Sequence, residues 1–263
     1  MFKRVLSSVS RAVTAVLFPP VCSFCNAAGA DSDSLLCPSC VQTIKWVEEP
    51  FCSHCGRVAA GLVGHGPIVC GACLAAPPAY GSARYGAYYE AELRKAIIRF
   101  KFYGALHQRR PLSHVLIQAF HRHFEGTAFD VIVPVPIHRS RLISRGFNQV
   151  VALTEQLSRE TGITLDRTSL RKIKETAPQV GLTRAQRIEN LRGSMAVVRP
   201  EALKGKTVLL VDDVATSGAT IRETSKILKR AGASHVHCLV LALRSDLGHD
   251  RLDFPPDDQA PLG

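Results

Sequence analysis

The chain has 263 residues, of which 46% are hydrophobic and 21% charged, and its formal net charge is +11. This composition is typical of a globular protein and excludes disordered, collagen-like and polytopic membrane classes. At roughly 100–200 residues per domain, the length allows one full domain and a smaller one. Residues 84–192 hold 19 Lys and Arg against nine Asp and Glu, which favours a phosphate-rich partner, either a phosphorylated small molecule or a nucleic acid.

The N-terminal residues show no clear targeting signal. Arg11 interrupts their short apolar run, and no small-residue cleavage site precedes the first cysteine. No stretch of 18 or more apolar residues occurs in the sequence. We therefore expect a cytoplasmic protein without a membrane span.

Four Cys-x-x-Cys pairs dominate the first 73 residues. In a reducing cytosol such pairs indicate metal, because two pairs complete a tetrahedral zinc shell with no open position. The sequence therefore predicts a double zinc ribbon over residues 18–76 with two structural zinc ions. Sequential pairing is the simplest arrangement, while interleaved pairing and metal-free cysteines are the alternatives. The eight ligands are Cys22, Cys25, Cys37, Cys40, Cys52, Cys55, Cys70 and Cys73.

Two helices are expected after a linker at Pro77-Pro78. Apolar residues at helical spacing predict an amphipathic helix over residues 89–102, and a second helix is expected over residues 111–124. The second helix carries His114, His121 and His123, which lack a carboxylate partner at a suitable spacing. We interpret these histidines as residues of a solvated face rather than as metal ligands.

From residue 130 onward, short β-rich runs alternate with helical patterns, which is typical of an α/β fold with a mainly parallel, helix-covered sheet. Strands are expected over residues 130–135, 165–173, 207–211 and 235–243, and helices over residues 146–160, 183–191 and 218–230. Cys238 falls inside the last strand and is expected to be a buried core thiol. The polar tail from Arg244 to the end is expected to be disordered.

The strongest chemical signal is the segment 208–220, VLLVDDVATSGAT. A buried strand delivers two adjacent carboxylates, Asp212 and Asp213, into a small-residue loop that opens a helix. The backbone N–H groups and hydroxyls of such a loop bind a phosphate, and Gly218 permits close approach. The two carboxylates suit the vicinal hydroxyls of a sugar. This segment resembles the phosphoribosyl pyrophosphate (PRPP) motif of type I phosphoribosyltransferases.

A second motif narrows the resemblance. The segments PVPIHRSR at residues 134–141 and RGFNQ at residues 145–149 resemble the ComF family of competence-associated, phosphoribosyltransferase-like proteins, in which cysteine pairs also precede the domain. The resemblance covers about residues 18–243. It implies a type I phosphoribosyltransferase domain over residues 84–243 behind the double zinc ribbon, with residues 244–263 as the tail.

The resemblance also implies roles for individual residues. Asp212 and Asp213 hold the ribose and take part in catalysis, and Lys174 is a further catalytic residue on a basic loop over residues 172–184 that resembles the mobile catalytic loop of type I enzymes. Magnesium would accompany PRPP. The residues implied to bind the PRPP sugar phosphate are Asp212, Asp213, Ala215, Thr216, Ser217, Gly218, Ala219 and Thr220, and those implied for the pyrophosphate are His138, Arg139, Arg141 and Arg145.

The resemblance implies a transferase that moves ribose 5-phosphate from PRPP, with inversion, to an acceptor that the sequence does not identify. The alternative is a non-catalytic PRPP-sensing or nucleic-acid-associated adaptor, with single-stranded DNA or proteins of the competence machinery as partners. Both hypotheses need the Asp pair, but only catalysis needs the mobile loop.

Overall fold

The computed structural model describes residues 20–58, 68–176 and 184–244 of the chain. The expected disorder of the tail concerns residues 245–263, apart from Arg244, and so lies outside the described residues. Most of the basic loop over residues 172–184 also lies outside them, because its segment 177–183 is not described.

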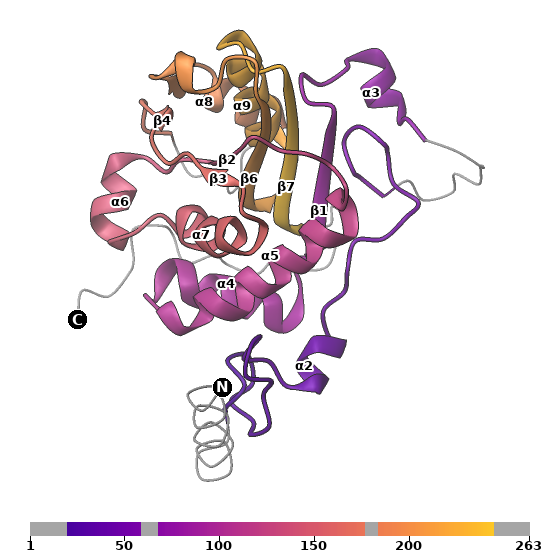
Figure 1. The fold of residues 1–263 in the computed structure, drawn as a ribbon, viewed down its shortest axis with the longest axis vertical. Coiled ribbons are helices and arrows are strands. Elements are labelled where there is room, and N and C mark those ends of the chain that lie inside the picture. Colours follow the sequence, from indigo (N-terminus) through magenta and orange to yellow (C-terminus); the bar gives the residue numbers. More distant parts are fainter. Residues whose placement is uncertain (1–19, 59–67, 177–183, 245–263) are drawn as a thin grey trace, which may run out of the picture.

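In the described part of the chain, five strands form one sheet in the order β1-β7-β6-β2-β3, and every neighbouring pair is parallel. The parallel α/β prediction is therefore confirmed. Parallel strands need crossover connections, which the helices between them provide (Figure 1). The strands are β1 (Ser82–Tyr88), β2 (Val131–Pro134), β3 (Thr164–Leu165), β6 (Thr207–Ala215) and β7 (His235–Leu243).

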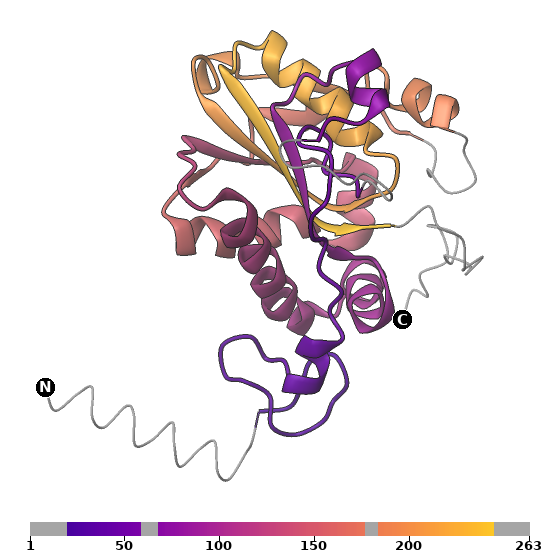
Figure 2. The same ribbon diagram turned by 90° about the vertical axis from the view of Figure 1, so that its right-hand side faces the viewer.

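Helices cover both faces of the sheet (Figures 1 and 2). Helices α4 (Ala91–Phe102), α5 (Arg109–Phe124) and α7 (Gln149–Thr161) pack on one face, where Leu209 and Val211 of β6 join their core. On the other face lie α8 (Arg184–Leu191), α9 (Ala219–Arg230) and a small antiparallel pair of strands, β4 (Leu170–Lys172) and β5 (Met195–Val197). Val208 and Leu210 point to this second face, because side chains alternate along a strand.

The remaining described elements are short. Two five-residue helices, α2 (Pro38–Gln42) and α3 (Gly71–Ala75), begin directly after Cys37 and Cys70 and contain Cys40 and Cys73. Two 3-10 turns, η1 (Leu106–Gln108) and η2 (Pro200–Ala202), precede α5 and β6. A seven-residue helix, α6 (Arg139–Arg145), follows β2.

The predicted strand over residues 165–173 is wrong as a single element. Leu165 ends β3 in the main sheet, whereas Leu170 begins β4 in the separate antiparallel pair. Between them the Asp166 carboxylate accepts the backbone N–H groups of Thr168 and Ser169, at 2.9 and 3.0 Å. This local side-chain turn competes with an extended backbone and breaks the strand.

The predicted helix over residues 146–160 begins too early. Gly146 has φ +80° and ends the preceding helix α6, which the sequence analysis did not predict. The next helix, α7, begins at Gln149, because the Asn148 side chain caps its first N–H groups.

Two further boundaries differ from expectation. The strand expected over residues 207–211 extends to Ala215, so both Asp212 and Asp213 lie within β6 rather than in the loop after it. The strand β1 was not predicted; it begins two residues before the expected domain start at residue 84 and pairs with β7 along its length.

The histidines of α5 do not behave alike. His121 is exposed, as expected, and His114 is half-buried. His123 is half-buried, so its assignment to a solvated face is wrong: its ring lies edge-on to Phe51, and Nε2 is 3.2 Å from the carbonyl oxygen of Tyr85. Burial lowers the pKa of His123. Cys238 is fully buried, which confirms its place in the core.

Among the described residues, no helix has the length and apolar character needed to cross a membrane.

Candidate functional site

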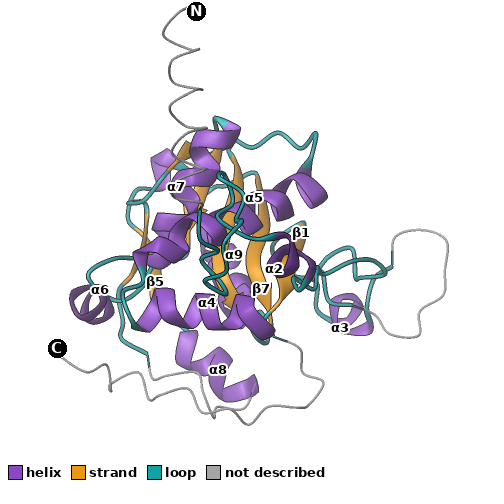
Figure 3. Cartoon of the chain, turned by 90° about the horizontal axis from the view of Figure 1, so that it is seen from below, coloured by secondary structure: helices purple, strands orange, loops and turns teal. Residues whose placement is uncertain are grey.

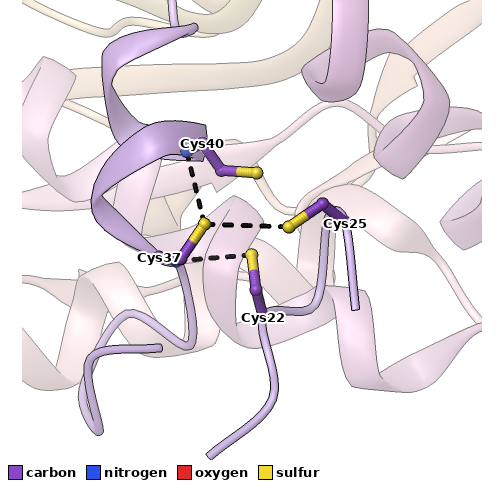
Figure 4. A group of neighbouring side chains, drawn as sticks. All are labelled: Cys22, Cys25, Cys37 and Cys40. Atoms are coloured by element: carbon purple, nitrogen blue, oxygen red, sulfur yellow. Dashed lines mark hydrogen bonds between the residues drawn. The ribbon is translucent and has the colours of Figure 1, made fainter. Parts of the chain in front are cut away.

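The eight paired cysteines form two groups of four. Cys22, Cys25, Cys37 and Cys40 bring their sulfur atoms within 4.8 Å of one another, and so do Cys52, Cys55, Cys70 and Cys73. The grouping is sequential, which settles the pairing in favour of the simpler prediction. Figure 4 shows the four side chains of the first group pointing toward one centre.

The two groups are built in the same way, and we call the segment around Cys22–Cys40 the first zinc knuckle and that around Cys52–Cys73 the second. In the first knuckle, the backbone N–H of Asn26 donates to the carbonyl of Cys22, and the N–H of Cys37 donates to the Cys22 sulfur at 3.3 Å. In the second, the N–H of Gly56 donates to the carbonyl of Cys52, and the N–H of Cys70 donates to the Cys52 sulfur, also at 3.3 Å. In each group, one backbone bond closes the turn around the first cysteine pair and the other orients the sulfur of its first cysteine.

The donor set fits zinc. Burial raises the pKa of the Cys22 and Cys52 thiols, but backbone N–H donors outweigh it and bring each pKa down to about 6. A cysteine binds metal as the thiolate, and a tetrahedral shell of four cysteine sulfurs leaves no position for substrate. Each group therefore fits a structural zinc ion rather than a catalytic one.

The two knuckles contact different parts of the molecule, as the separate positions of α2 and α3 show in Figure 3. The first packs against the helical layer: the Gln108 side chain donates to the carbonyl of Ser23 at 2.6 Å, and Arg99 donates to the carbonyl of Phe24. The second packs against β1, where the N–H of Ala83 donates to the carbonyl of His54 at 2.7 Å.

The Asp pair lies in the central strand β6, which has β7 on one side and β2 on the other. Asp213 points to the helical layer that contains α4, where its Oδ1 accepts a hydrogen bond from Lys101 Nζ at 2.8 Å. This ion pair is shielded from water, with the side chains 7% and 17% exposed. The other carboxylate oxygen, Oδ2, is buried and has no hydrogen-bond partner among the described residues. A buried acceptor of this kind is costly unless a ligand supplies the missing donor.

Asp212 lies in a different environment. Burial, and then the neighbouring Asp213 carboxylate, raise the pKa of Asp212 to about 7. Lys172, the last residue of β4, interacts with Asp212 through its charge. Burial and the positive charge of Arg141 lower the pKa of Lys172, while the Asp212 carboxylate raises it. Lys101 thus pairs directly with Asp213, whereas the charges of both Lys101 and Lys172 act on Asp212.

The loop after β6 has the features expected of an anion site. Gly218 is the N-cap of the 12-residue helix α9 and has φ +71°, a conformation that glycine adopts without strain. The Ser217 hydroxyl is buried and has no hydrogen-bond partner in the described structure. Ala215 and Ala219 are buried, whereas Thr216 and Thr220 are half-buried. Backbone N–H groups at a helix N-terminus attract negative charge.

The residues expected to bind pyrophosphate run from the N-cap of α6, His138, to its last residue, Arg145. His138 caps this helix by accepting the N–H of Ser140. Arg139 is exposed, and Arg141 is close enough to Lys172 to lower its pKa. Arg145 is the last residue of α6; it donates to Gln149 at 2.8 Å, and its guanidinium carbon lies 5.2 Å from the centre of the Phe102 ring.

Lys174, the expected catalytic lysine, is exposed two residues after β4. Its neighbour Glu175 accepts a hydrogen bond from Ser140, so this segment contacts the start of α6.

Lys101 was not predicted as a site residue, and Lys172 was predicted only as the first residue of the basic loop over residues 172–184. Lys101 falls in the last turn of an amphipathic helix, where a basic residue is ordinary. Its distance of 112 positions from Asp213 leaves no local signal of the contact.

Comparison with known proteins agrees with this architecture. A family model described as a double zinc ribbon domain matches residues 13–74, and one described as a phosphoribosyl transferase domain matches residues 142–253. The chain is 34% identical over 212 residues to competence protein F of Haemophilus influenzae, covering 79% of this chain and 90% of that protein. It is 30% identical over 230 residues to DNA utilization protein YhgH of Escherichia coli K12, covering 86% and 98%.

Among solved structures, a crystal structure of adenine phosphoribosyltransferase aligns with 55% of this chain and 74% of its own, at 15% identity and a TM-score of 0.37.

Proposed function

The chain belongs to the competence protein F family, and we propose that it binds PRPP and transfers ribose 5-phosphate from it to an acceptor that is still to be identified. The phosphoribosyltransferase-like part would span residues 84–243, behind the zinc ribbon over residues 18–76. One observation carries the proposal. The buried Oδ2 of Asp213 and the buried hydroxyl of Ser217 both lack partners among the described residues, and both belong to the predicted PRPP segment.

These two atoms match the two ends of a sugar phosphate. A ribose hydroxyl can donate to Asp213 Oδ2 while Lys101 keeps Oδ1, so the ion pair need not break when the sugar binds. Ser217 can donate to a 5′-phosphate oxygen, together with backbone N–H groups of the loop at the start of α9. The remaining loop residues Ala215, Thr216, Gly218, Ala219 and Thr220 complete this part of the site.

The other proposed residues act on the pyrophosphate. They cap α6 or lie within it, and one of them, Arg141, is close to Lys172. The four residues are His138, Arg139, Arg141 and Arg145. Guanidinium groups pair with phosphate oxygens in a fork geometry, which favours arginine here. Magnesium, when bound, would neutralise charge on the leaving group, mainly through pyrophosphate oxygens and water. Asp212 and Asp213 are the carboxylates of the PRPP segment that could face it.

In the proposed reaction, the bond from ribose C1 to pyrophosphate breaks as the acceptor bonds to C1 from the opposite side. Asp213, and Asp212 when it is ionised, would stabilise positive charge that develops on the sugar ring. Lys174, on the segment that follows β4, is proposed to act on the leaving group.

A second candidate function follows from the Lys101–Asp213 ion pair. An ammonium 2.8 Å from the carboxylate offsets the negative charge that would stabilise a cationic sugar. This contact favours a PRPP-sensing or nucleic-acid-associated adaptor that holds PRPP without activating it. The names of the relatives, which refer to competence and DNA utilization, suggest single-stranded DNA or proteins of the competence machinery as partners. Eight reduced thiols suit the cytoplasm for either function.

Calorimetric titration with PRPP and magnesium tests the proposal on the wild type and the double variant Asp212→Asn/Asp213→Asn. We expect at least a 10-fold loss of PRPP affinity in the double variant, because the amides no longer accept hydroxyl hydrogen bonds as ions do. The matched control is Asp130→Asn, which alters a carboxylate that accepts the N–H of Thr207 at the other end of β6. Unchanged affinity in the double variant, or no binding by the wild type, contradicts the site.

Pyrophosphate release separates the two candidate functions. With purines, pyrimidines and amines offered as acceptors, an enzyme releases pyrophosphate and the double variant loses this activity. An adaptor binds PRPP and releases none with any acceptor.

A further inference from the structure

The second zinc knuckle lies directly against the first strand of the sheet. Gly56 has φ +66°, and a Cβ at this position would lie 2.2 Å from the backbone carbonyl oxygen of Ala83 in β1. Arg84 of β1 donates to the carbonyl of Ser53 at 2.9 Å. The knuckle backbone therefore has a fixed position on the sheet edge.

Tyr85 connects the knuckle to the candidate phosphate loop. Its side chain is 2% exposed. A Cβ at Gly56 would lie 3.1 Å from the Tyr85 ring, and a Cβ at Gly218 would lie 3.5 Å from the Tyr85 hydroxyl. One buried side chain thus lies with its ring edge beside Gly56 of the knuckle and its hydroxyl beside the N-cap of α9.

Arg57, the residue after Gly56, makes the direct contact. Its guanidinium donates to the backbone carbonyl of Thr216 at 3.4 Å, across 159 positions of sequence. The carbonyl of one residue and the N–H of the next point in opposite directions across a trans peptide. Holding the Thr216 carbonyl toward the knuckle therefore turns the N–H of Ser217 away from it. It also fixes the loop of the Ser217 hydroxyl, which has no partner within the described parts of the chain.

The first knuckle shows that this arginine is not needed to build a knuckle. In the first knuckle, Asn26 holds the position of Gly56, and the N–H of Cys22 donates to the carbonyl of Ala27 at 2.8 Å. In the second, the N–H of Cys52 donates to the carbonyl of Arg57 at 2.9 Å. The backbone carbonyls of Ala27 and Arg57 thus accept the same hydrogen bond in their knuckles. The knuckle fold therefore does not require the Arg57 side chain.

We propose that the second zinc knuckle is part of the PRPP site, and that Arg57 is a positioning residue that orders the 5′-phosphate loop through the Thr216 carbonyl. The proposal rests on the proposed PRPP function and deepens it. The ligand class is a sugar 5-phosphate, and the zinc ion contributes by fixing the knuckle from which Arg57 extends.

The test compares three variants of the full chain with bound zinc. Arg57→Ala installs the residue that the first knuckle carries, and Arg57→Lys keeps a cation. The matched control is Arg222→Ala, which removes another arginine bond between the two parts of the chain, the one to the carbonyl of Ala76 at 3.0 Å. The measurements are the dissociation constants for PRPP and for ribose 5-phosphate, the zinc content and the melting temperature.

We expect Arg57→Ala to weaken binding of both ligands about 10-fold, the usual loss when one hydrogen bond to a charged group is removed. Arg57→Lys should recover part of this loss, and Arg222→Ala should bind like the wild type. Two zinc ions, and a melting temperature lowered no further than in Arg222→Ala, should accompany the loss in Arg57→Ala. A merely structural arginine would lower the melting temperature and leave the affinity unchanged.

Three results overturn the proposal: wild-type affinity in Arg57→Ala, an equal loss in Arg222→Ala, or loss of a zinc ion from Arg57→Ala. A wild type that binds neither ligand instead contradicts the proposed PRPP function. The two failures are therefore distinguishable.

Discussion

The two zinc knuckles of this chain have closely matching backbones in different surroundings. Each begins with an isolated antiparallel bridge, Val21 with Ala28 in the first and Phe51 with Val58 in the second. In each, one inter-pair sulfur distance is 3.7 Å, and the second cysteine pair leads into a five-residue helix. Thirty positions separate Cys22 from Cys52. The geometry of the metal site is therefore the same in both knuckles, although few residues other than the cysteines are identical.

The difference lies in what each knuckle touches. Asn26 and Gly56 have nearly the same backbone angle, φ 63° and φ +66°. Asn tolerates this left-handed conformation, so the angle alone does not require glycine. Glycine is needed at position 56 because the Ala83 carbonyl leaves no room for a Cβ. Zinc binding thus determines the backbone of a knuckle, whereas the neighbouring domain determines its side chains.

Removing one metal site at a time is the strongest way to break this comparison. Cys52→Ser/Cys55→Ser and Cys22→Ser/Cys25→Ser should each lower the zinc content from two ions to one. Structural zinc supplies the folding free energy of such a module, roughly 10 kcal/mol or more, so the affected knuckle should unfold. We expect PRPP binding to be lost only in the first variant, as measured by metal analysis and calorimetry. Equal loss of PRPP binding in both would mean that the knuckles are not functionally distinct.

Exchanging the left-handed residues sharpens the comparison further. Gly56→Asn adds a Cβ that would lie 2.2 Å from the backbone oxygen of Ala83, so the sheet edge must shift. We expect a loss of about 3 kcal/mol in the free energy of unfolding, as for other overpacked sites. Asn26→Gly is the matched control and should cost less than about 1 kcal/mol, since it only frees the unfolded chain. Urea unfolding measures both. Equal costs would show that the conformation, not the contact, selects glycine.

The first knuckle has its own anchor, and removing it should affect stability alone. Gln108 is fully buried, and its Nε2 donates to the carbonyl of Ser23 at 2.6 Å. Gln108→Ala leaves that carbonyl without its donor, which should cost about 1–3 kcal/mol of unfolding free energy. PRPP affinity should not change. This outcome is the converse of that expected for Arg57→Ala, and a weakened PRPP affinity in Gln108→Ala would contradict the assignment of separate roles.

Much of this architecture could be predicted from the sequence, and the exceptions have physical reasons. Cysteine spacing indicated both metal groups because a tetrahedral shell imposes a local pattern. Hydrophobic periodicity indicated α4, α5, β2 and β7, since each buries one continuous apolar face or run. The strand β1 was missed because its residues pair with β7 over 150 positions away, and its small residues, such as Gly86, carry little hydrophobic signal.

The candidate site likewise has a part that could be predicted from the sequence and a part that could not. The Asp pair and its loop could be recognised because they are contiguous in sequence. Lys101 and Arg57 could not, since each reaches the loop or strand from an element more than 100 positions away. Single basic residues in a chain with 33 Lys and Arg give no signal of such a contact.

The smallest expected effect concerns nucleic acid, and it extends the comparison to the surroundings of the first knuckle. A hollow beside this knuckle is lined by Arg109, Arg110 and Arg159, among others. Arg110 also lies 3.5 Å from Asp33 of the first knuckle, and both side chains are largely exposed, so this pair contributes little to stability. The arginines lie in the basic stretch 84–192. Arg110 and Arg159 have side chains 48% and 69% exposed, whereas Arg109 is paired with Glu155 at 3.0 Å. We expect any affinity for single-stranded DNA on this side to be electrostatic, weak in sequence preference and steeply dependent on salt.

Arg110→Ala/Arg159→Ala should lower single-stranded DNA affinity several-fold at low salt and reduce the slope of log affinity against log salt by about 0.7 per lost phosphate contact. The control Lys226→Ala/Arg230→Ala removes the same charge from α9, on the opposite face of the sheet. Gel-shift titrations at several salt concentrations compare the two. Equal slopes would mean that only net charge matters. A smaller slope in the first variant alone would place DNA contact beside the first knuckle, apart from the sugar-phosphate site proposed at Arg57 and the second knuckle. Such a division has a physical reason, because a phosphate backbone needs exposed cations, whereas a small ligand needs a buried, fixed loop.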